Sequence, residues 1–286
     1  MAVFMWLHIF RTHPPFLSNL SHRSADRPLF RMRYNASVTD AMRLTNRCIG
    51  MLTLLSSARW LKTSQVHRRY FAGASLSAAR RRLRLLEEKK YLVRYRENRM
   101  AESLWTVGRE GRRVLEKQGL DISLERRPPK QIEHYLGIND VRVAAELFPD
   151  LLYFFSCWEL PTINWRHRLL PDGLIGLPGK TFAMEFDRGQ ESLAYFVRTK
   201  VEVYRRGLPG LPLWAVLIVA DSDARMKSLI RAAGAGATPA MLFSTLDRVR
   251  ERGLSAPIFS GAGGDGIHLR QPVSSKCSVD ETGFDS

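Results

Sequence analysis

Residues 170–206 read LPDGLIGLPGKTFAMEFDRGQESLAYFVRTKVEVYRR, and two short apolar segments in this stretch carry acidic residues. Asp172 begins the first segment, and Glu185 and Asp187 end the second. A tight turn between two strands would gather these carboxylates at one edge of a sheet. The two-residue spacing of Glu185 and Asp187 places both on the same strand face. Because gathered carboxylates repel one another, the pattern predicts a positive group between them, of which Mg²⁺ is the usual choice.

The segments around this stretch alternate between helical and strand-like patterns. Residues 213–220, LWAVLIVA, are almost uniformly apolar, which is typical of a buried central strand. The order predicts an α/β sandwich around a mixed sheet. From residue 260 the composition turns to Gly, Ser and Asp, which favours a flexible tail. The expected elements are helices at 131–148, 191–206 and 221–233 and strands at 151–160, 169–177, 181–187, 213–220 and 241–244.

The chain before residue 120 has a different organisation. Its periodicity predicts three helices, then two strands joined by a polar turn, and then a further helix. That order is typical of a winged helix-turn-helix, whose third helix enters the major groove of DNA. In the third helix, Ala79, Leu83 and Leu86 are spaced to face inward. The expected helices span 39–55, 63–70, 75–90 and 109–118, and the strands span 91–96 and 103–107.

Positive charge is concentrated in the same part of the chain. Residues 1–130 hold 27 Lys and Arg against 10 Asp and Glu, a net +17, and the remainder carries −1, for a total of +16. Such a distribution favours binding to a polyanion, and we expect double-stranded DNA. The alternative is a solvated helix face paired with Glu87 and Glu88. The candidate DNA-binding residues are Ser75, Ser77, Arg80, Arg81, Arg84, Arg94 and Arg96.

The length of 286 residues fits two domains of ordinary size. Residues 124–130, LERRPPK, read as a linker because paired prolines stop helices and charges favour water. We therefore expect a loosely ordered arm at 1–37, a winged-helix domain at 38–120, a linker at 121–130, an α/β domain at 131–259 and a tail at 260–286.

Three sequence motifs in the carboxylate stretch together resemble the pattern of a known protein family. The sequence PDG stands at 171–173, E-x-D-R-G at 185–189, and Lys200 and Tyr204 follow in the next helix. This combination resembles the replication-relaxation family, whose members are bacterial proteins of plasmids and other mobile elements. Gln190 stands where that family usually has Thr.

The resemblance implies an N-terminal winged helix followed by a restriction-endonuclease-like domain of the PD-(D/E)xK type, an α+β or α/β architecture. It implies a role in plasmid or mobile-element replication or relaxation, with other replication or mobilisation proteins as further partners. The implied site residues are Asp172, Glu185, Asp187 and Lys200, and the first two would hold Mg²⁺.

One departure from nuclease chemistry is Asp187, because an active nuclease usually has Lys at this position. Lys200, Lys180 or Arg188 would have to supply the missing charge, and Glu159 would add a fourth carboxylate. The site is therefore either a metal-dependent nuclease or nickase, or, as we slightly favour, a degenerate fold kept for DNA binding. A purely structural turn at 187–189 stays open, as does a transcriptional regulator with a ligand-sensing second domain.

Several classes are disfavoured by the sequence. There is no GxxxxGK[ST] loop, and Cys48, Cys157 and Cys277 lack zinc-ligand or disulfide spacing. These cysteines fit a reducing cytoplasm, and we expect a cytoplasmic protein without a membrane segment. The pattern leaves oligomerisation, including a dimer, open.

Overall fold

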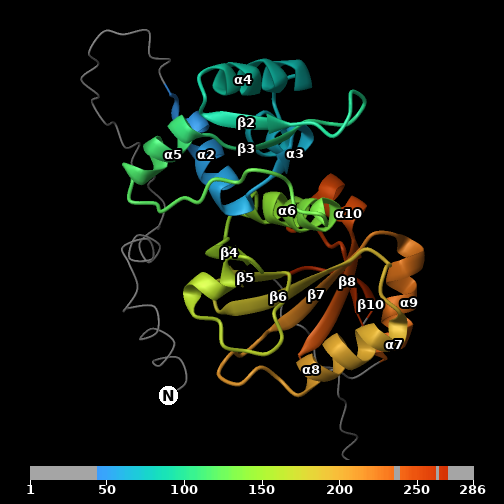
Figure 1. Ribbon diagram of the computed structural model, residues 1–286. Helices are drawn as coiled ribbons and strands as arrows, with labels where there is room; N and C mark the ends of the chain where they lie inside the picture. The colour runs from blue at the N-terminus through green and yellow to red at the C-terminus, as the bar shows by residue number, and fades with distance from the viewer. Residues whose placement is uncertain (1–43, 235–238, 262–263, 270–286) are drawn as a thin grey trace, which may run out of the picture. The chain divides into compact units, whose positions relative to one another are not determined.

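The computed structural model describes residues 44–234, 239–261 and 264–269. The arm expected at 1–37 and the start of the first expected helix lie outside these residues. The elements up to residue 118, which we call the three-stranded region, follow the expected order except for the added short strand β1 (Figure 1). They are α2 (Asn46–Ala58), β1 (Leu61–Lys62), α3 (Thr63–Tyr70), α4 (Leu76–Glu88), β2 (Leu92–Tyr95), β3 (Leu104–Val107) and α5 (Arg109–Glu116).

Helix α4 forms where its sequence predicts. The Ser75 hydroxyl caps the helix by accepting a hydrogen bond from the backbone N–H of Ala78. Ala79, Leu83 and Leu86 recur at helical spacing and are fully buried, as expected. After the helix, β2 pairs antiparallel with β3, and β1 pairs with the other edge of β3, so that the sheet order is β1-β3-β2.

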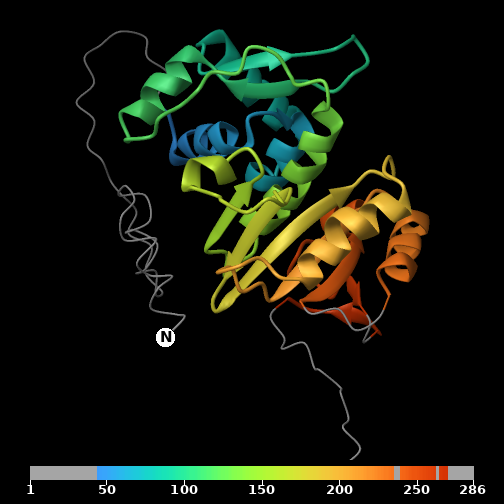
Figure 2. The same ribbon diagram turned by 60° about the horizontal axis from the view of Figure 1, so that its bottom comes forward.

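The remaining elements, which we call the seven-stranded region, are built around a mixed sheet (Figures 1 and 2). Its strands are β4 (Tyr153–Ser156), β5 (Gly173–Leu177), β6 (Lys180–Asp187), β7 (Ala215–Ala220), β8 (Ala240–Thr245), β9 (Phe259–Gly261) and β10 (Gly264–Ile267). Its helices are α6 (Ile132–Glu146), the 3₁₀ turn η1 (Leu160–Ile163), α7 (Leu193–Phe196), the π-helical η2 (Val197–Val201), α8 (Glu202–Arg205), α9 (Asp223–Ala233) and α10 (Leu246–Arg252).

The sheet order is β10-β9-β8-β7-β6-β5-β4. Strands β4, β5 and β6 form an antiparallel meander, whereas β6, β7 and β8 run parallel. Strand β7 is the central strand and all of its residues are buried, which confirms the expectation from its apolar run. Helices α6 and α10 pack on one face of the sheet, and α7, α8 and α9 run along the other (Figure 2). The protein is therefore an α+β molecule with a mixed seven-stranded sheet.

Some sequence expectations for this region are wrong. The tail expected from residue 260 is contradicted at 264–267, because β9 and β10 pair and extend the sheet. The strand expected at 151–160 covers only β4, since Cys157, Trp158 and Glu159 form a turn that leads into η1. Helix α10 was not expected at all. Glycines hid β10, because they give a strand pattern no side-chain alternation.

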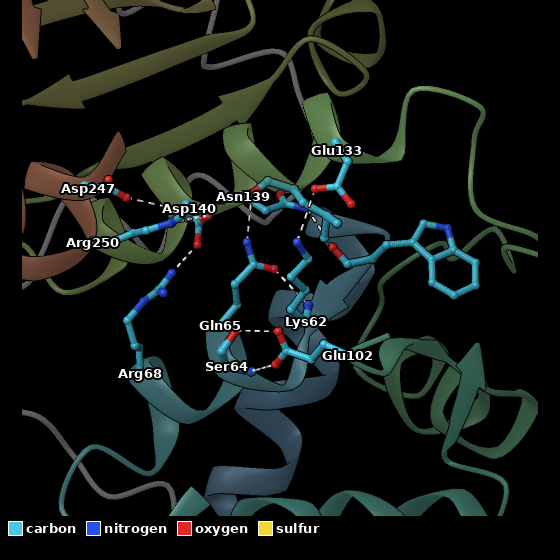
Figure 3. A network of polar contacts seen from close by, with 12 residues as sticks. Lys62, Ser64, Gln65, Arg68, Glu102, Glu133, Asn139, Asp140, Asp247 and Arg250 are labelled. Carbon is cyan, nitrogen blue, oxygen red and sulfur yellow. Dashed lines mark hydrogen bonds and ion pairs between the residues drawn. The ribbon is translucent and has the colours of Figure 1, made fainter. Parts of the chain in front are cut away.

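Helix α6 joins the two regions through buried polar contacts (Figure 3). The fully buried Asn139 amide donates to the carbonyl oxygens of Ala58 and Trp60 at 2.9 and 2.7 Å. The Gln65 amide of α3 donates to the Leu136 carbonyl at 2.7 Å. The two Asn139 bonds satisfy backbone carbonyls at and just after the C-terminal end of α2, where a helix leaves carbonyl groups without intrahelical partners. The domain boundary expected at 121–130 stays a prediction.

Asp140, also on α6, forms an ion-pair triad (Figure 3). Its buried carboxylate pairs with Arg68 of α3 and, at 2.7 Å, with Arg250 of α10. Gly137 of the same helix faces the Phe186 ring so closely that a Cβ would lie 1.9 Å from a ring carbon. Glycine there lets α6 approach β6.

Within the described residues, no helix combines the length and the apolar character that crossing a membrane requires.

Candidate functional site

A pocket of about 190 Å³ opens where β5 begins and β6 ends. The hairpin register pairs Gly173 with Met184, so Asp172 arrives beside Glu185 as the turn at 178–179 predicts. The lining is mostly polar and charged. We call this cavity the carboxylate pocket, and it is lined by Gln131, His134, Asp172, Glu185, Phe186, Asp187, Arg188, Gln190, Glu191, Phe196 and Lys200.

Asp172 is held from two sides. One carboxylate oxygen accepts a hydrogen bond from His134 Nε2 at 2.9 Å, and the other accepts from the backbone N–H of Phe186 at 2.9 Å. The His134 ring also stacks on the Phe186 ring, with 5.6 Å between the ring centroids. Burial alone would lower the pKa of His134, but the hydrogen bond and charge of Asp172 outweigh it and raise that pKa. His134 therefore carries more positive charge near neutral pH than an exposed histidine does.

Glu185 lies deeper and contacts the helix that follows β6. Its carboxylate accepts a hydrogen bond from Lys200 Nζ at 2.6 Å and another from the Tyr204 hydroxyl. Burial raises the pKa of Glu185 to about 7, although the Lys200 charge opposes the shift. Lys200 lies in the π-helical segment η2, and such segments often occur at functional sites. The pair is therefore an internal ion pair at the floor of the pocket.

Asp187 turns toward a different partner. Its carboxylate accepts from the Arg225 guanidinium of α9, with Nε at 2.8 Å and Nη2 at 2.9 Å. It also accepts the backbone N–H of Gly189 at 2.6 Å. Gly189 has a φ of 73°, a conformation that favours glycine. The sequence D-R-G thus forms a locked turn, as the structural alternative expected, although Ser192 rather than Asp187 caps α7.

The geometry unites the PDG strand start, the E-x-D-R-G strand end and the helix with Lys200 and Tyr204 around one pocket. A model of the replication-relaxation family matches residues 52–208, more than half of the 286 residues. The chain belongs to the replication-relaxation family. No curated protein and no solved structure matches it. The family match spans all of the residues that line the pocket, but it ends before Arg225.

Other residues considered for the site lie elsewhere. Glu159 pairs with Arg142 and accepts from the Ser156 backbone N–H at 2.8 Å, so it is not a fourth carboxylate of the pocket. The Lys180 ammonium donates to the Leu269 carbonyl at 3.0 Å, near the far end of β6. Neither residue lines the pocket. The alternation of β6 places Lys180 seven residues from Asp187, too far along the strand to share its surroundings.

In this replication-relaxation chain, sequence reasoning named Tyr204 only as part of the family motif and assigned no site role to His134 or Arg225. His134 and Asp172 are 38 residues apart in sequence, as are Asp187 and Arg225. A local sequence pattern cannot predict contacts between residues that lie 38 positions apart. The positions of Lys200 and Tyr204, four residues apart on one helix, did carry a signal, because this spacing puts both on the same helix face.

The pocket residues do not fit a divalent cation as they are arranged. Mg²⁺ takes six oxygen ligands, of which one or two are carboxylate oxygens that must be free to face the ion. Here the carboxylates of Asp172, Glu185 and Asp187 already accept hydrogen bonds from protein donors. In the part of the chain that the structure describes, no group of three or more His, Cys, Asp or Glu side chains could hold a metal ion.

The candidate DNA-binding residues divide into two kinds. Arg80, Arg81 and Arg84 of α4 are exposed, and none has an ion pair with another residue in the described ranges. We call these three the basic face. Ser77 is also exposed, whereas the Ser75 hydroxyl is used as the helix cap.

Two arginines of the β2–β3 hairpin, Arg94 and Arg96, have partners within the chain. Arg94 pairs with Glu87 at 3.1 Å, and the Arg96 guanidinium donates to the Ser103 hydroxyl at 3.1 Å. The alternative of a helix face paired with glutamates therefore applies to the contact between Arg94 and Glu87 but does not extend to the basic face. Arg82 of α4 is likewise occupied, because its guanidinium donates to the Cys48 sulfur at 2.9 Å.

Proposed function

We propose that this chain is a DNA-binding protein that acts in the replication or relaxation of plasmids or other mobile elements. Membership of the replication-relaxation family supports the biological setting. One observation carries the DNA-binding part, namely that the three arginines of the basic face are exposed and have no ion-pair partner among the described residues. Arginines in this state are available for phosphate contacts.

In this proposal the three-stranded region is a winged helix-turn-helix. The order of α2, α3, α4 and the β2–β3 hairpin supports it, with α4 as the helix that enters the major groove of duplex DNA. Residues on α4 that point away from Ala79, Leu83 and Leu86 face the ligand. The basic face then contributes both phosphate contacts and long-range attraction.

The seven-stranded region is, in the same proposal, a nuclease-like domain whose carboxylate pocket has lost metal-dependent chemistry. The pairing of its carboxylates with His134, Lys200 and Arg225 supports this part. Such pairing keeps the carboxylate geometry while satisfying the charges internally. We infer a cytoplasmic protein that works with other replication or mobilisation proteins.

The test is duplex DNA binding measured as a function of salt. Each phosphate contact contributes about 0.9 to the slope of log affinity against log salt concentration. The triple variant Arg80→Gln/Arg81→Gln/Arg84→Gln should bind more weakly and lower the magnitude of that slope by about 2 to 3. Fluorescence anisotropy with a labelled duplex between 50 and 200 mM salt measures both quantities.

Helix α5 offers a matched control. Its residues Arg109, Arg112 and Arg113 pair with Glu110 or Glu116, so the same change to glutamine removes equal charge from paired positions. The control variant should keep a slope close to that of the wild type. If both triple variants lose the same slope, the affinity comes from net charge alone and the assignment of α4 is wrong.

A second candidate function is a metal-dependent nuclease or nickase, and one observation favours it. Lys200 Nζ lies 2.6 Å from Glu185 in the pocket, so a lysine from the helix has reached the site even though Asp187 occupies the usual lysine position. Supercoiled plasmid incubated with Mg²⁺, Mn²⁺ or chelator, beside a Glu185→Ala variant, tests this candidate. Nicking that needs metal and vanishes in the variant would establish it.

A further inference from the structure

The turn 187–189 holds one residue whose side chain has no structural role among the described residues. Asp187 anchors the turn to Arg225, and Gly189 supplies the positive φ and the N–H that closes the turn. Arg188 lies between them and lines the carboxylate pocket. Its guanidinium has no hydrogen bond or ion pair with any residue that the structure describes. The turn therefore fixes the backbone of Arg188 at the pocket while its guanidinium has no partner among the described residues.

The charges around Arg188 show what such a cation can bind. The three acidic residues Asp172, Glu185 and Asp187 each contact a basic side chain: His134, Lys200 and Arg225. Much of the negative charge of the pocket floor is therefore compensated within the protein. Besides Arg188, two amide side chains, Gln131 and Gln190, line the pocket without a hydrogen-bond partner in the described part of the chain.

We propose that Arg188, assisted by Lys200, binds a phosphate group of a DNA strand in this pocket without a divalent cation. The inference rests on the proposed DNA-binding function and adds a second contact point to it. The planar guanidinium matches two phosphate oxygens at once. Lys200 uses one of its three N–H donors on Glu185 and keeps the others for a ligand.

The size and charge of the pocket agree with one phosphate group. Its volume of about 190 Å³ admits a phosphate with part of the attached sugar but not a duplex. Glu191 also lines the pocket and would repel an anion, which makes binding depend strongly on Arg188. The ion pairs of the floor supply the neutralisation that a metal ion would otherwise give to carboxylates beside a phosphate.

The experiment measures binding of a labelled hexathymidylate to the full chain by fluorescence anisotropy. The protein carries the triple substitution of the basic face, so that α4 does not contribute. The oligonucleotide is prepared with a 5′-phosphate or a 5′-hydroxyl, and each is measured in EDTA and in Mg²⁺. We expect equal affinity in EDTA and in Mg²⁺, within about twofold. Adding Arg188→Gln should weaken binding about tenfold or more, because a charge-assisted contact is lost.

Arg166→Gln is the matched control. Arg166 is exposed, its only described hydrogen bond goes to Asn164, and it does not line the pocket. The control should bind as its parent does, and Arg188→Lys should retain part of the affinity. Preference for the 5′-phosphate would assign the site to a strand end, and equal binding would assign it to an internal phosphodiester.

Two results would overturn the proposal: unchanged binding by Arg188→Gln, or binding that appears only with Mg²⁺. The thermal midpoint of Arg188→Gln should equal that of its parent, because the side chain has no partner in the described structure. Loss of duplex binding by the basic-face variant, tested separately, reports on the proposed function. A negative result for duplex binding by α4 can therefore be distinguished from a negative result for phosphate binding in the pocket.

Discussion

The basic face of α4 and the carboxylate pocket are both rich in charge, but the charges are unpaired on α4 and paired in the pocket. On α4, Arg80, Arg81 and Arg84 project into solvent without ion-pair partners among the described residues. In the pocket, the carboxylates of Asp172 and Glu185 are paired and largely removed from water. The contrast separates charges available to a ligand from charges that belong to the fold.

This difference has an energetic basis. An exposed arginine costs almost nothing to leave unpaired, because water solvates it. A buried carboxylate is expensive to desolvate and persists only with a cation or hydrogen-bond donors beside it. The unpaired charges of the basic face and of Arg188 are therefore the ones available to a ligand, whereas the paired charges define the shape of the pocket.

The largest effect should follow Lys200→Met, which leaves Glu185 buried without its cation. Breaking a buried pair costs about 3–5 kcal/mol. Urea denaturation at pH 8 measures the loss. Lys227→Met, an exposed change on α9, is the control and should stay within about 0.5 kcal/mol of the wild type. Equal stability of the two variants would mean that Lys200 does not neutralise Glu185.

Arg225→Gln should have a smaller but clear effect. The substitution removes the two charge-assisted hydrogen bonds to Asp187, which are worth about 1.5–3 kcal/mol. Arg231→Gln on the exposed side of the same helix is the control, because its described contact is a long hydrogen bond to Ser228. Thermal denaturation of both variants decides whether Arg225 anchors the turn.

The stability difference between wild type and Glu185→Gln should depend on pH. The pKa of Glu185 is raised from its ordinary 4.5 to about 7 in the folded protein, so the folded state holds the proton more tightly. This contribution is fully present below about pH 4.5 and is lost as pH rises to about 7. Urea titrations of both proteins between pH 4.5 and 8 should show that the free energy of unfolding of the wild type falls steadily relative to that of Glu185→Gln as the pH rises. A difference that stays constant with pH would contradict the raised pKa.

The smallest effect on stability should come from the basic face. Arg80→Gln/Arg81→Gln/Arg84→Gln removes three charges, yet the free energy of unfolding should change by only about 0.5 kcal/mol or less, because no described partner is lost. Relief of like-charge repulsion along α4 would even make the change slightly favourable. Loss of more than about 1 kcal/mol would show that these arginines have structural partners after all.

The sequence predicted much of this architecture because the decisive signals are local. The apolar run of β7, the Ala79–Leu83–Leu86 spacing of α4 and the turn between β5 and β6 each act over a few residues. The meeting of Asp172 with Glu185 followed from that turn. The contacts of Asp172 with His134 and of Asp187 with Arg225 did not follow, because they join residues distant in sequence. Strand β10 was missed because its glycines carry no pattern.

The polar contacts of α6 have a consequence for how the chain is held together. Asn139, Asp140 and Leu136 attach this helix directly to α3 and to the end of α2, whereas the exposed peptide around Arg126 and Arg127 only connects α5 to α6. We expect the contacts of α6, rather than the peptide bond there, to hold the two parts together. A backbone cleaved between those two arginines would leave fragments that remain associated, and the two pieces are natural halves for reassembly from separate polypeptides.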